Sequence, residues 1–461
     1  MAVKSISRSV TWQLCGKIAL EGIAFFTTPI FTRLLSPEEY GFVSLYISWL
    51  SIFGLLIGLC INGSIGNARI EYSSSILPKY LSSILTISVI SFIIFLFLFV
   101  FWGQYLENII KLKKNLLILL CVHSFSSFIL NFEITRLNQL KKVEKATILS
   151  LSYSIICITT SLIFVVITKR NQALAKIYGQ AMPTIIYGFI LLIFIYFKGK
   201  KVWSNDYSKF CLSLTLPLIF HQLGHLIFSQ SDRLMLQRML GDDVLGVYSV
   251  SFTLCGVLSM IFGALNSSWV PFYYDYKKNN ENETIIVHTR RYLKFYTLIT
   301  IGFLLLSYDV FKIIAPKSYY SGMKIIPLLV ISIYFSFLYL FPVNFEFYKL
   351  KTKLIPVATF SAALLNIIIN YLLIPRYGFI GAAIGTVVSH IILFLFHEII
   401  ARFIIKNFEY PWHIYFPGIC CVVIFSICSF LLKDLVFIRW GLFFFVSLYL
   451  FIDILKNKSL F

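Results

Sequence analysis

Ionisable residues interrupt several of the chain's long apolar runs, and the first such pair is Lys17 and Glu21. The two lie four positions apart, so a helix through this run places them on one face and within pairing distance. At about 1.5 Å per residue from Arg8, Lys17 lies about 13 Å along that helix, well into an apolar layer. One interpretation is that the Lys17 ammonium at this depth attracts a phosphate or a sugar acid. Glu21 would then modulate the charge of Lys17 or bind a coupling cation. The alternative is a mutually neutralising pair that packs against a neighbouring helix.

Three further charges lie at the ends of apolar runs. Glu133 and Arg136 are three positions apart and share a helix face, which predicts either a coupling or cavity-lining pair or side chains that extend to the membrane interface. Arg69 follows another apolar run, with Glu71 beside it. We interpret Arg69 as a cation that receives an anionic group at an entrance, or as a solvated loop charge.

His221 and His225 share a helix face, and Asp232 and Arg233 follow about two turns later. The histidines have the spacing of a metalloprotease HExxH motif, but Gln222 occupies the position of the general base and no third ligand is evident. No metal site is therefore predicted. The histidines are interpreted as a polar packing face or as cavity-lining groups that carry a proton, and Asp232 and Arg233 as substrate-binding residues.

The elements that position these residues are predicted to be transmembrane helices. Apolar residues make up 59% of the chain and charged residues 13%, and apolar runs of about 20 residues cross a bilayer as helices. The sequence predicts an all-α integral membrane protein with about fourteen spans. Their approximate ranges are 10–32, 41–66, 80–104, 115–138, 146–168, 173–197, 210–231, 244–270, 291–314, 322–345, 355–374, 379–403, 414–432 and 435–456.

The distribution of basic residues predicts an orientation. An even number of spans puts both termini on one side, and Lys and Arg are more frequent in the connections on that side, for example at 141–145 and 198–209. By the positive-inside rule this side is the cytoplasm. The net charge of +20 is therefore mainly topological, and nucleic-acid binding is excluded because no loop supplies a basic reading surface. The nine cysteines lie within predicted helices without a CxxC pair, which indicates neither a disulfide framework nor a cofactor.

The chain contains an internal repeat at an offset of 205 residues. Arg33 aligns with Arg238, Gly41 with Gly246, and Gly58 with Gly263. Six predicted spans precede the one at 210–231, so the offset maps the first span onto the seventh. An even number of spans per repeat preserves orientation, which predicts two parallel six-helix lobes, as in transporters with repeats about an axis along the membrane normal. The predicted domains are 1–209, 210–403 and a C-terminal helix pair at 404–461.

Three segments carry a resemblance to a known family. They are Phe31–Gly41 (FTRLLSPEEYG), Ser231–Leu236 (SDRLML) followed by Leu245–Tyr248 (LGVY), and Ile374–Ala383 (IPRYGFIGAA). Together they resemble the signatures of Wzx-type polysaccharide (O-antigen) flippases, in the superfamily that includes the multidrug and toxic compound extrusion (MATE) exporters. The resemblance covers the whole chain in span order.

The resemblance implies a MATE-like fold of two six-helix lobes with two extra C-terminal helices. It further implies a non-enzymatic transporter of the bacterial inner membrane that turns an undecaprenyl-pyrophosphate-linked oligosaccharide from the cytoplasmic to the periplasmic leaflet. Partners implied with it are membrane lipids, a proton or sodium ion, and a polysaccharide polymerase with its chain-length regulator. We expect alternating access, with the prenyl tail along a groove made by the last two helices.

Two other functions stay open on the sequence. A cation-coupled multidrug exporter would be favoured by a cavity lined by carboxylates, whereas Lys and Arg favour the flippase. A membrane-embedded polysaccharide polymerase would need a sizeable aqueous loop with catalytic groups. The longest connection, at 271–290, holds acidic residues among Lys and Asn and is typical of a solvated linker.

Overall fold

A computed structural model describes residues 2–406 and 408–457, apart from some side chains of the first helix, Glu21 among them, and of the last two residues. The described residues form helices joined by short connections and contain no strand. The all-α fold predicted from the apolar runs is therefore confirmed. By their packing the helices group into two compact units, which are described separately below.

Unit 1 comprises residues 1–27 and 39–230, and unit 2 comprises residues 28–38 and 231–461. The boundaries between them fall inside two long helices, α1 and α8, and next to the start of α2. The helices of the first half of the chain are α1 (Ala2–Leu34), α2 (Pro37–Gly58), the 3-10 turn η1 (Ile61–Ser64), α3 (Ile65–Glu71), α4 (Leu77–Ile110), α5 (Lys114–Gln139), α6 (Val143–Ile167), α7 (Gln172–Gly199) and α8 (Asn205–Leu240).

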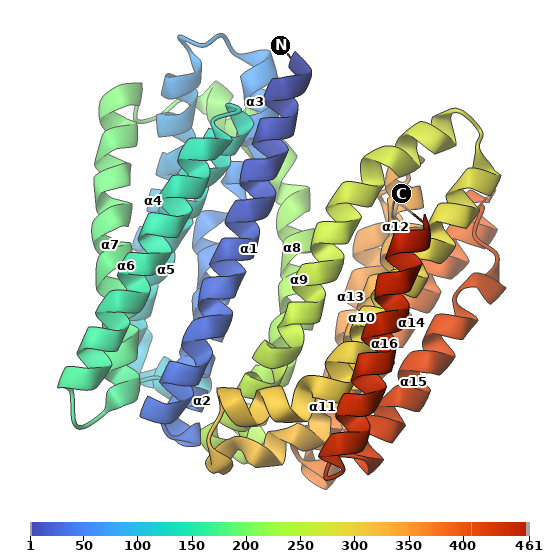
Figure 1. The fold of residues 1–461 in the computed structure, drawn as a ribbon. Helices are drawn as coiled ribbons and strands as arrows, with labels where there is room; N and C mark the ends of the chain where they lie inside the picture. The colour runs from blue at the N-terminus through green and yellow to red at the C-terminus, as the bar shows by residue number, and fades with distance from the viewer. Residues whose placement is uncertain (1, 407, 458–461) are drawn as a thin grey trace. The chain divides into compact units, whose positions relative to one another are not determined.

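In unit 1, α4, α5, α6 and α7 pack side by side (Figure 1). Small residues allow this close approach: a Cβ added to Gly188 of α7 would lie 2.6 Å from the side chain of Ser126 on α5. Between α2 and α3 the chain breaks its helix, since Leu59 and Cys60 take left-handed backbone conformations with φ of 48° and 52°. This break directs the short helix α3 and its Arg69 toward the end of α5.

Unit 2 is formed by the second half of the chain. Its helices are α9 (Asp242–Lys278), α10 (Asn282–Ile314), the 3-10 segment η2 (Lys317–Ile325), α11 (Ile326–Leu338), α12 (Leu340–Tyr348), α13 (Leu354–Tyr377), α14 (Phe379–Ile399), the π-helical turn η3 (Ile400–Ile405), the 3-10 turn η4 (Trp412–Ile414), α15 (Phe416–Leu431) and α16 (Val436–Asn457). Helices α13 and α14 pack closely because Gly385 leaves room for Asn370: a Cβ there would lie 2.2 Å from the Asn370 Oδ1.

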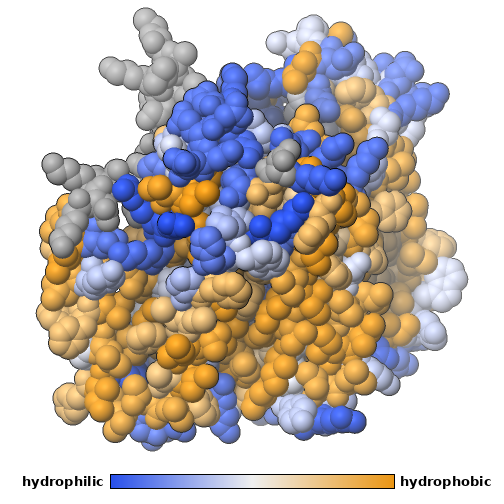
Figure 2. Space-filling view, turned by 90° about the vertical axis from the view of Figure 1, so that its right-hand side faces the viewer, coloured by the Kyte–Doolittle hydropathy of each residue, from blue (hydrophilic) through white to orange (hydrophobic). Residues whose placement is uncertain are grey.

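Among the described residues, thirteen helical segments are long and apolar enough to cross a membrane. The helix α1 covers the first predicted span, at 10–32, in addition to these thirteen. Exposed aromatic and aliphatic side chains are numerous on α4, α7 and α16. On the face shown in Figure 2, hydrophobic residues form a broad zone with hydrophilic residues gathered above and below it. The chain is therefore a multi-pass membrane protein.

Three predicted spans differ in detail from the observed helices. The span expected at 41–66 ends at Gly58 in α2, because Leu59 and Cys60 break the helix. The span expected to end near residue 270 continues through Pro271 to Lys278 in α9. The fully buried rings of Trp269 and Tyr273 hold this stretch in place, and their packing outweighs the hydrogen bond lost at proline. The span expected at 322–345 is divided into α11 and α12, which meet at Tyr339.

The units defined by packing do not use the boundaries at 209 and 403 that the repeat suggested. Residues 210–230 pack with unit 1, and the last two helices pack with unit 2. Packing groups residues by contact and carries no information on duplication. The three-part division at 1–209, 210–403 and 404–461 therefore stays a prediction about repeats.

Candidate functional site

Two of the sequence-predicted site residues, Arg69 and Arg136, line one cavity in unit 1. The cavity has a volume of about 380 Å³ and lies where α3, α5 and α7 end and α4 begins. Lys142, in the turn before α6, and Lys198, in the last turn of α7, contribute two further cations. Among the residues that the structure describes around this cavity, none is acidic. We name it the cationic cavity.

Each arginine of the cavity is held by a contact with α5. The buried carboxylate of Glu133 accepts two hydrogen bonds from Arg136, at 2.7 Å from Nε and 2.5 Å from a terminal nitrogen. Arg69 donates to the backbone carbonyl of Gln139 at 2.6 Å. The forked contact fixes the plane of the Arg136 guanidinium, and each arginine keeps further N–H groups for another oxygen acceptor. Glu133 and Arg136 therefore form the ion pair that their spacing indicated.

One wall of the cationic cavity is apolar. It is made by Leu77, Pro78, Leu81, Leu140, Phe194 and Ile195. The Lys198 ammonium lies 5.7 Å from the centre of the Phe194 ring. Tyr72 adds a hydroxyl, and burial together with neighbouring Tyr207 and Glu71 raises the pKa of Tyr72, so this group stays protonated and able to donate. Cations beside an apolar wall suit an anion that carries a hydrocarbon chain.

Asp232 lies in the interior of unit 2, at 5% exposure. Its carboxylate accepts hydrogen bonds from Tyr248 at 2.8 Å, Asn370 at 2.7 Å and Thr386 at 2.5 Å. Asn366 continues the network by accepting from Asn370 at 3.0 Å. Among the described residues no cation forms an ion pair with Asp232. The buried carboxylate is therefore compensated by hydrogen bonds from three uncharged side chains.

The remaining predicted site residues lie elsewhere. Lys17 is an exposed residue of α1, and the side chain of Glu21 lies outside the described residues, so their pairing stays a prediction. Arg233 stacks on the ring of Phe252, with 5.0 Å between the guanidinium carbon and the ring centre. His225 is exposed on α8.

His221 is half-buried on α8, and its Nδ1 makes no hydrogen bond with the described part of the chain. No group of three His, Cys, Asp or Glu residues comes together within that part of the chain. The roles assigned to the two histidines from their spacing stay predictions.

Sequence reasoning did not place Lys142 and Lys198 in a site. Both were recognised only as members of basic clusters that orient the chain. The available signal was their position directly at predicted helix ends, on the same side of the membrane as Arg69 and Arg136. Which helix ends are neighbours is decided by tertiary packing, because α3, α5 and α7 meet through contacts far apart in the sequence.

The chain shares its fold with solved multi-pass membrane transporters. It resembles the solved lipid II flippase MurJ in its inward closed conformation, with a TM-score of 0.72, 17% identity and coverage of 98% of this chain and 99% of that one. It also resembles a multidrug resistance MATE family transporter of the MOP superfamily in its inward-facing conformation, with a TM-score of 0.61, 14% identity and coverage of 85% and 96%.

The chain belongs to the polysaccharide biosynthesis protein family, whose model matches residues 6–276, more than half of its length. A relative from Haemophilus influenzae, Lsg locus putative protein 1, is 23% identical over 355 residues, which cover 74% of this chain and 84% of that protein. The sequence resemblance to polysaccharide flippases of the MATE-like superfamily is confirmed by this family match and by the fold.

Proposed function

We propose that this protein is a flippase for undecaprenyl-pyrophosphate-linked oligosaccharides, such as O-antigen repeat units, and that it moves them from the cytoplasmic to the periplasmic leaflet by alternating access. The observation that carries the proposal is the cationic cavity. Four cations beside an apolar wall match a diphosphate attached to a hydrocarbon tail. A multidrug exporter for cations would present carboxylates there instead.

A second cavity, in unit 2, suits the prenyl tail. It has a volume of about 490 Å³ and lies between α10, α15 and α16, with mostly apolar walls that include Leu293, Ile301 and Pro417. Arg290 and His413 also line it. We propose that this cavity serves as the tail groove expected from the last two helices, with α10 as an additional wall.

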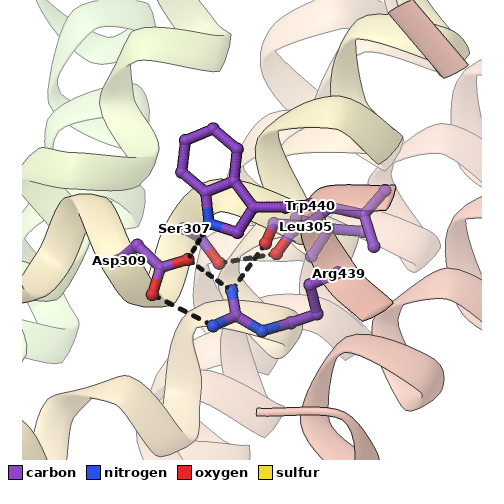
Figure 3. A network of polar contacts seen from close by, with 6 residues as sticks. Leu305, Ser307, Asp309, Arg439 and Trp440 are labelled. Atoms are coloured by element: carbon purple, nitrogen blue, oxygen red, sulfur yellow. Dashed lines mark hydrogen bonds and ion pairs between the residues drawn. The ribbon is translucent and has the colours of Figure 1, made fainter. Parts of the chain in front are cut away.

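Ion pairs hold α16 against α10 on either side of this groove. Arg439, fully buried, makes two hydrogen bonds with Asp309, at 2.9 and 3.0 Å, and a third with the Leu305 carbonyl at 2.7 Å (Figure 3). Trp440 donates to the same carboxylate at 3.2 Å. Nearer the start of α10 and the end of α16, Lys294 in the groove wall forms an ion pair with Asp453 of α16, at 2.6 Å. These two ion pairs join α16 to α10 at two separate points and thereby position the two helices that line the groove.

Asp232 supports coupling to a proton or a sodium ion. The carboxylate and the amide and hydroxyl oxygens of Asn366, Asn370 and Thr386 are the hard donors that a small cation prefers. Replacing Asp232 by Asn keeps the shape of the cluster and removes its charge. We expect this variant to transport without dependence on the cation gradient, or to lose transport, while folding normally.

The positive-inside bias supports insertion in the inner membrane with both termini in the cytoplasm. In this orientation the cationic cavity opens toward the cytoplasmic side, where the lipid-linked substrate is assembled. A polysaccharide polymerase with its chain-length regulator would act on the product in the opposite leaflet. The chain itself performs no covalent chemistry in this scheme.

Gene deletion in the native bacterium tests the function. The expected result is loss of a surface glycan, with lipid-linked repeat units accumulating in the cytoplasmic leaflet. Complementation with Arg69→Ala or Lys198→Ala should be poor. The matched control is Lys169→Ala, which removes an exposed cation at the opposite end of α6 from Lys142. Normal surface glycan in the deletion strain would contradict the proposal.

The same complementation assay tests two residues outside the cavities. Lys17→Ala and Arg233→Ala address the predictions made from the sequence for these positions. Full activity of a variant would remove that residue from the substrate path, without affecting the argument from the cationic cavity.

A further inference from the structure

Unit 1 contains another cavity, which differs in chemistry from the cationic cavity. It has a volume of about 420 Å³ and lies between the second half of α2, the break that follows it, the middle of α5 and the first half of α8. Its polar wall is made by Ser51, Asn62, Ser127, Asn131 and Gln222. We name it the neutral cavity, because the thiol of Cys60 is the one ionisable side chain among the described residues that line it.

Three carboxamides face this cavity, from Asn62, Asn131 and Gln222. Asn131 and Gln222 are exposed, and no other described residue makes a hydrogen bond with any of the three side-chain amides. Unpaired amides on membrane-crossing helices are costly unless water or a ligand satisfies them. The three groups therefore provide unused donors and acceptors to whatever fills the space.

The break after α2 explains why one of these groups, Asn62, reaches the cavity. The left-handed conformations of Leu59 and Cys60 end the helix, and the following turn brings Asn62 to the wall. Gly54, one turn before the break, leaves open space: a Cβ added there would meet no heavy atom within 4 Å. The ring of Phe128, on the α5 side, provides an apolar surface.

The two cavities of unit 1 use different faces of α5. Asn131 and Arg136 are five residues apart, which corresponds to a rise of about 7.5 Å and a rotation of about 140° around the helix. The cations are thus separated from the neutral cavity, and an anion gains little by entering it. Carboxamides and hydroxyls suit a neutral ligand rich in hydroxyl groups, since each amide offers one acceptor and two donors. The aromatic ring suits the C–H face of a sugar.

We propose that the neutral cavity is a glycan subsite, which binds one uncharged sugar residue of the transported lipid-linked oligosaccharide. This inference rests on the proposed function and adds a second recognition element to it. The diphosphate is bound by charge, and the sugar is selected by the three carboxamides. A flippase with both elements discriminates a glycosylated prenyl diphosphate from the bare lipid.

Binding to the purified full-length chain in nanodiscs tests the subsite. The probes are a short-chain prenyl diphosphate and the same lipid carrying glucose, galactose or N-acetylglucosamine. Wild-type protein is expected to bind at least one glycosylated probe about tenfold more tightly than the bare lipid. Asn131→Ala and Gln222→Ala should each reduce this preference about three- to tenfold, as expected for lost hydrogen bonds, and leave the affinity for the bare lipid unchanged.

Gly54→Phe provides a variant that adds a side chain instead of removing one. It fills the open space at the wall and should abolish the preference for sugar. The matched control is Arg69→Ala, which should weaken the bare and glycosylated probes by the same factor. Thermal unfolding of each variant reports separately on folding.

Equal affinity of the wild type for the bare lipid and all three glycosylated probes would overturn the glycan subsite and leave the proposed function standing. Equal weakening of both kinds of probe by Asn131→Ala would overturn it as well. Failure of the wild type to bind any prenyl diphosphate would instead contradict the proposed function.

Discussion

In unit 1 the cations Arg69, Lys142 and Lys198 are exposed at the wall of a cavity, whereas several buried charges of unit 2 form ion pairs, with Asp232 as an exception. The pair of Glu346 and His397 is fully buried at 2.8 Å. The side chains of the other pairs of the unit 2 interior are between 0% and 20% exposed; they are Lys277–Glu409, Arg402–Glu398 and Arg439–Asp309.

This difference separates two uses of charge in a membrane protein. A buried pair must compensate the loss of hydration of both ions, so its partners fix each other's position and the helices that carry them. An exposed cation at a cavity keeps its hydration and can exchange water for an anionic ligand. Unit 1 therefore offers charge to a ligand, and the ion pairs of unit 2 use charge to stabilise its packing.

The largest effect is expected from Arg439→Ala in unit 2. The change leaves Asp309 without its partner beside α16 and should destabilise the protein by about 3–5 kcal/mol. Thermal unfolding in detergent measures the loss. The double variant Arg439→Met with Asp309→Asn removes both charges and should recover most of the stability. A single variant as stable as wild type would show that this pair does not hold α16.

Arg69→Ala in unit 1 should affect ligand binding more than stability, in contrast to Arg439→Ala. Removal of one cation that contacts the ligand is expected to weaken binding of a prenyl diphosphate about tenfold, equivalent to about 1.4 kcal/mol. Stability should change by less than about 0.5 kcal/mol, because the side chain is exposed. Binding and unfolding are measured on the same preparation, with Lys169→Ala as control. A large loss of stability would remove the distinction between the two units.

Glu133→Gln tests the ion pair that lies between these extremes, since Arg136 is 12% exposed and Glu133 5%. Gln keeps an acceptor for Arg136 and removes the charge that competes with a ligand anion. Binding of a prenyl diphosphate should become about threefold tighter, with less than about 1 kcal/mol lost in stability. Weaker binding would mean that the carboxylate serves mainly to orient Arg136.

The smallest effect concerns pH. The pKa of Tyr72 is raised above its ordinary value of 10, so a rise from pH 7 to pH 9 adds no negative charge at this wall of the cationic cavity. Tyr72 should therefore contribute no change in affinity over this range, and wild type and Tyr72→Phe should have parallel pH profiles there. Repulsion of the diphosphate by the phenolate is expected only above pH 10, in wild type alone. Divergence of the two profiles below pH 9 would contradict this expectation.

Much of the fold could be predicted from the sequence, since hydrophobic length alone identifies a membrane helix. The predicted helix end was wrong at Pro271, which the sequence marks as a helix breaker. Pro271 lies inside α9, because the neighbouring rings of Trp269 and Tyr273 are buried. Of the site, the pairing of Glu133 with Arg136 followed from a spacing of three residues. The cluster around Asp232 did not, because its hydrogen-bond partners come from three other helices.

Hydropathy, residue spacing and continuous motifs were enough to predict the membrane environment, the order of the spans, the pairing of Glu133 with Arg136 and the family, because these depend on short stretches of sequence. It took the packed fold to show that two sets of residues share a cavity: Arg69, Arg136, Lys142 and Lys198 in one, and Asn62, Asn131 and Gln222 in the other. Neighbouring helix ends in a bundle are chosen by side-chain packing over long sequence separations, and no local pattern encodes that choice.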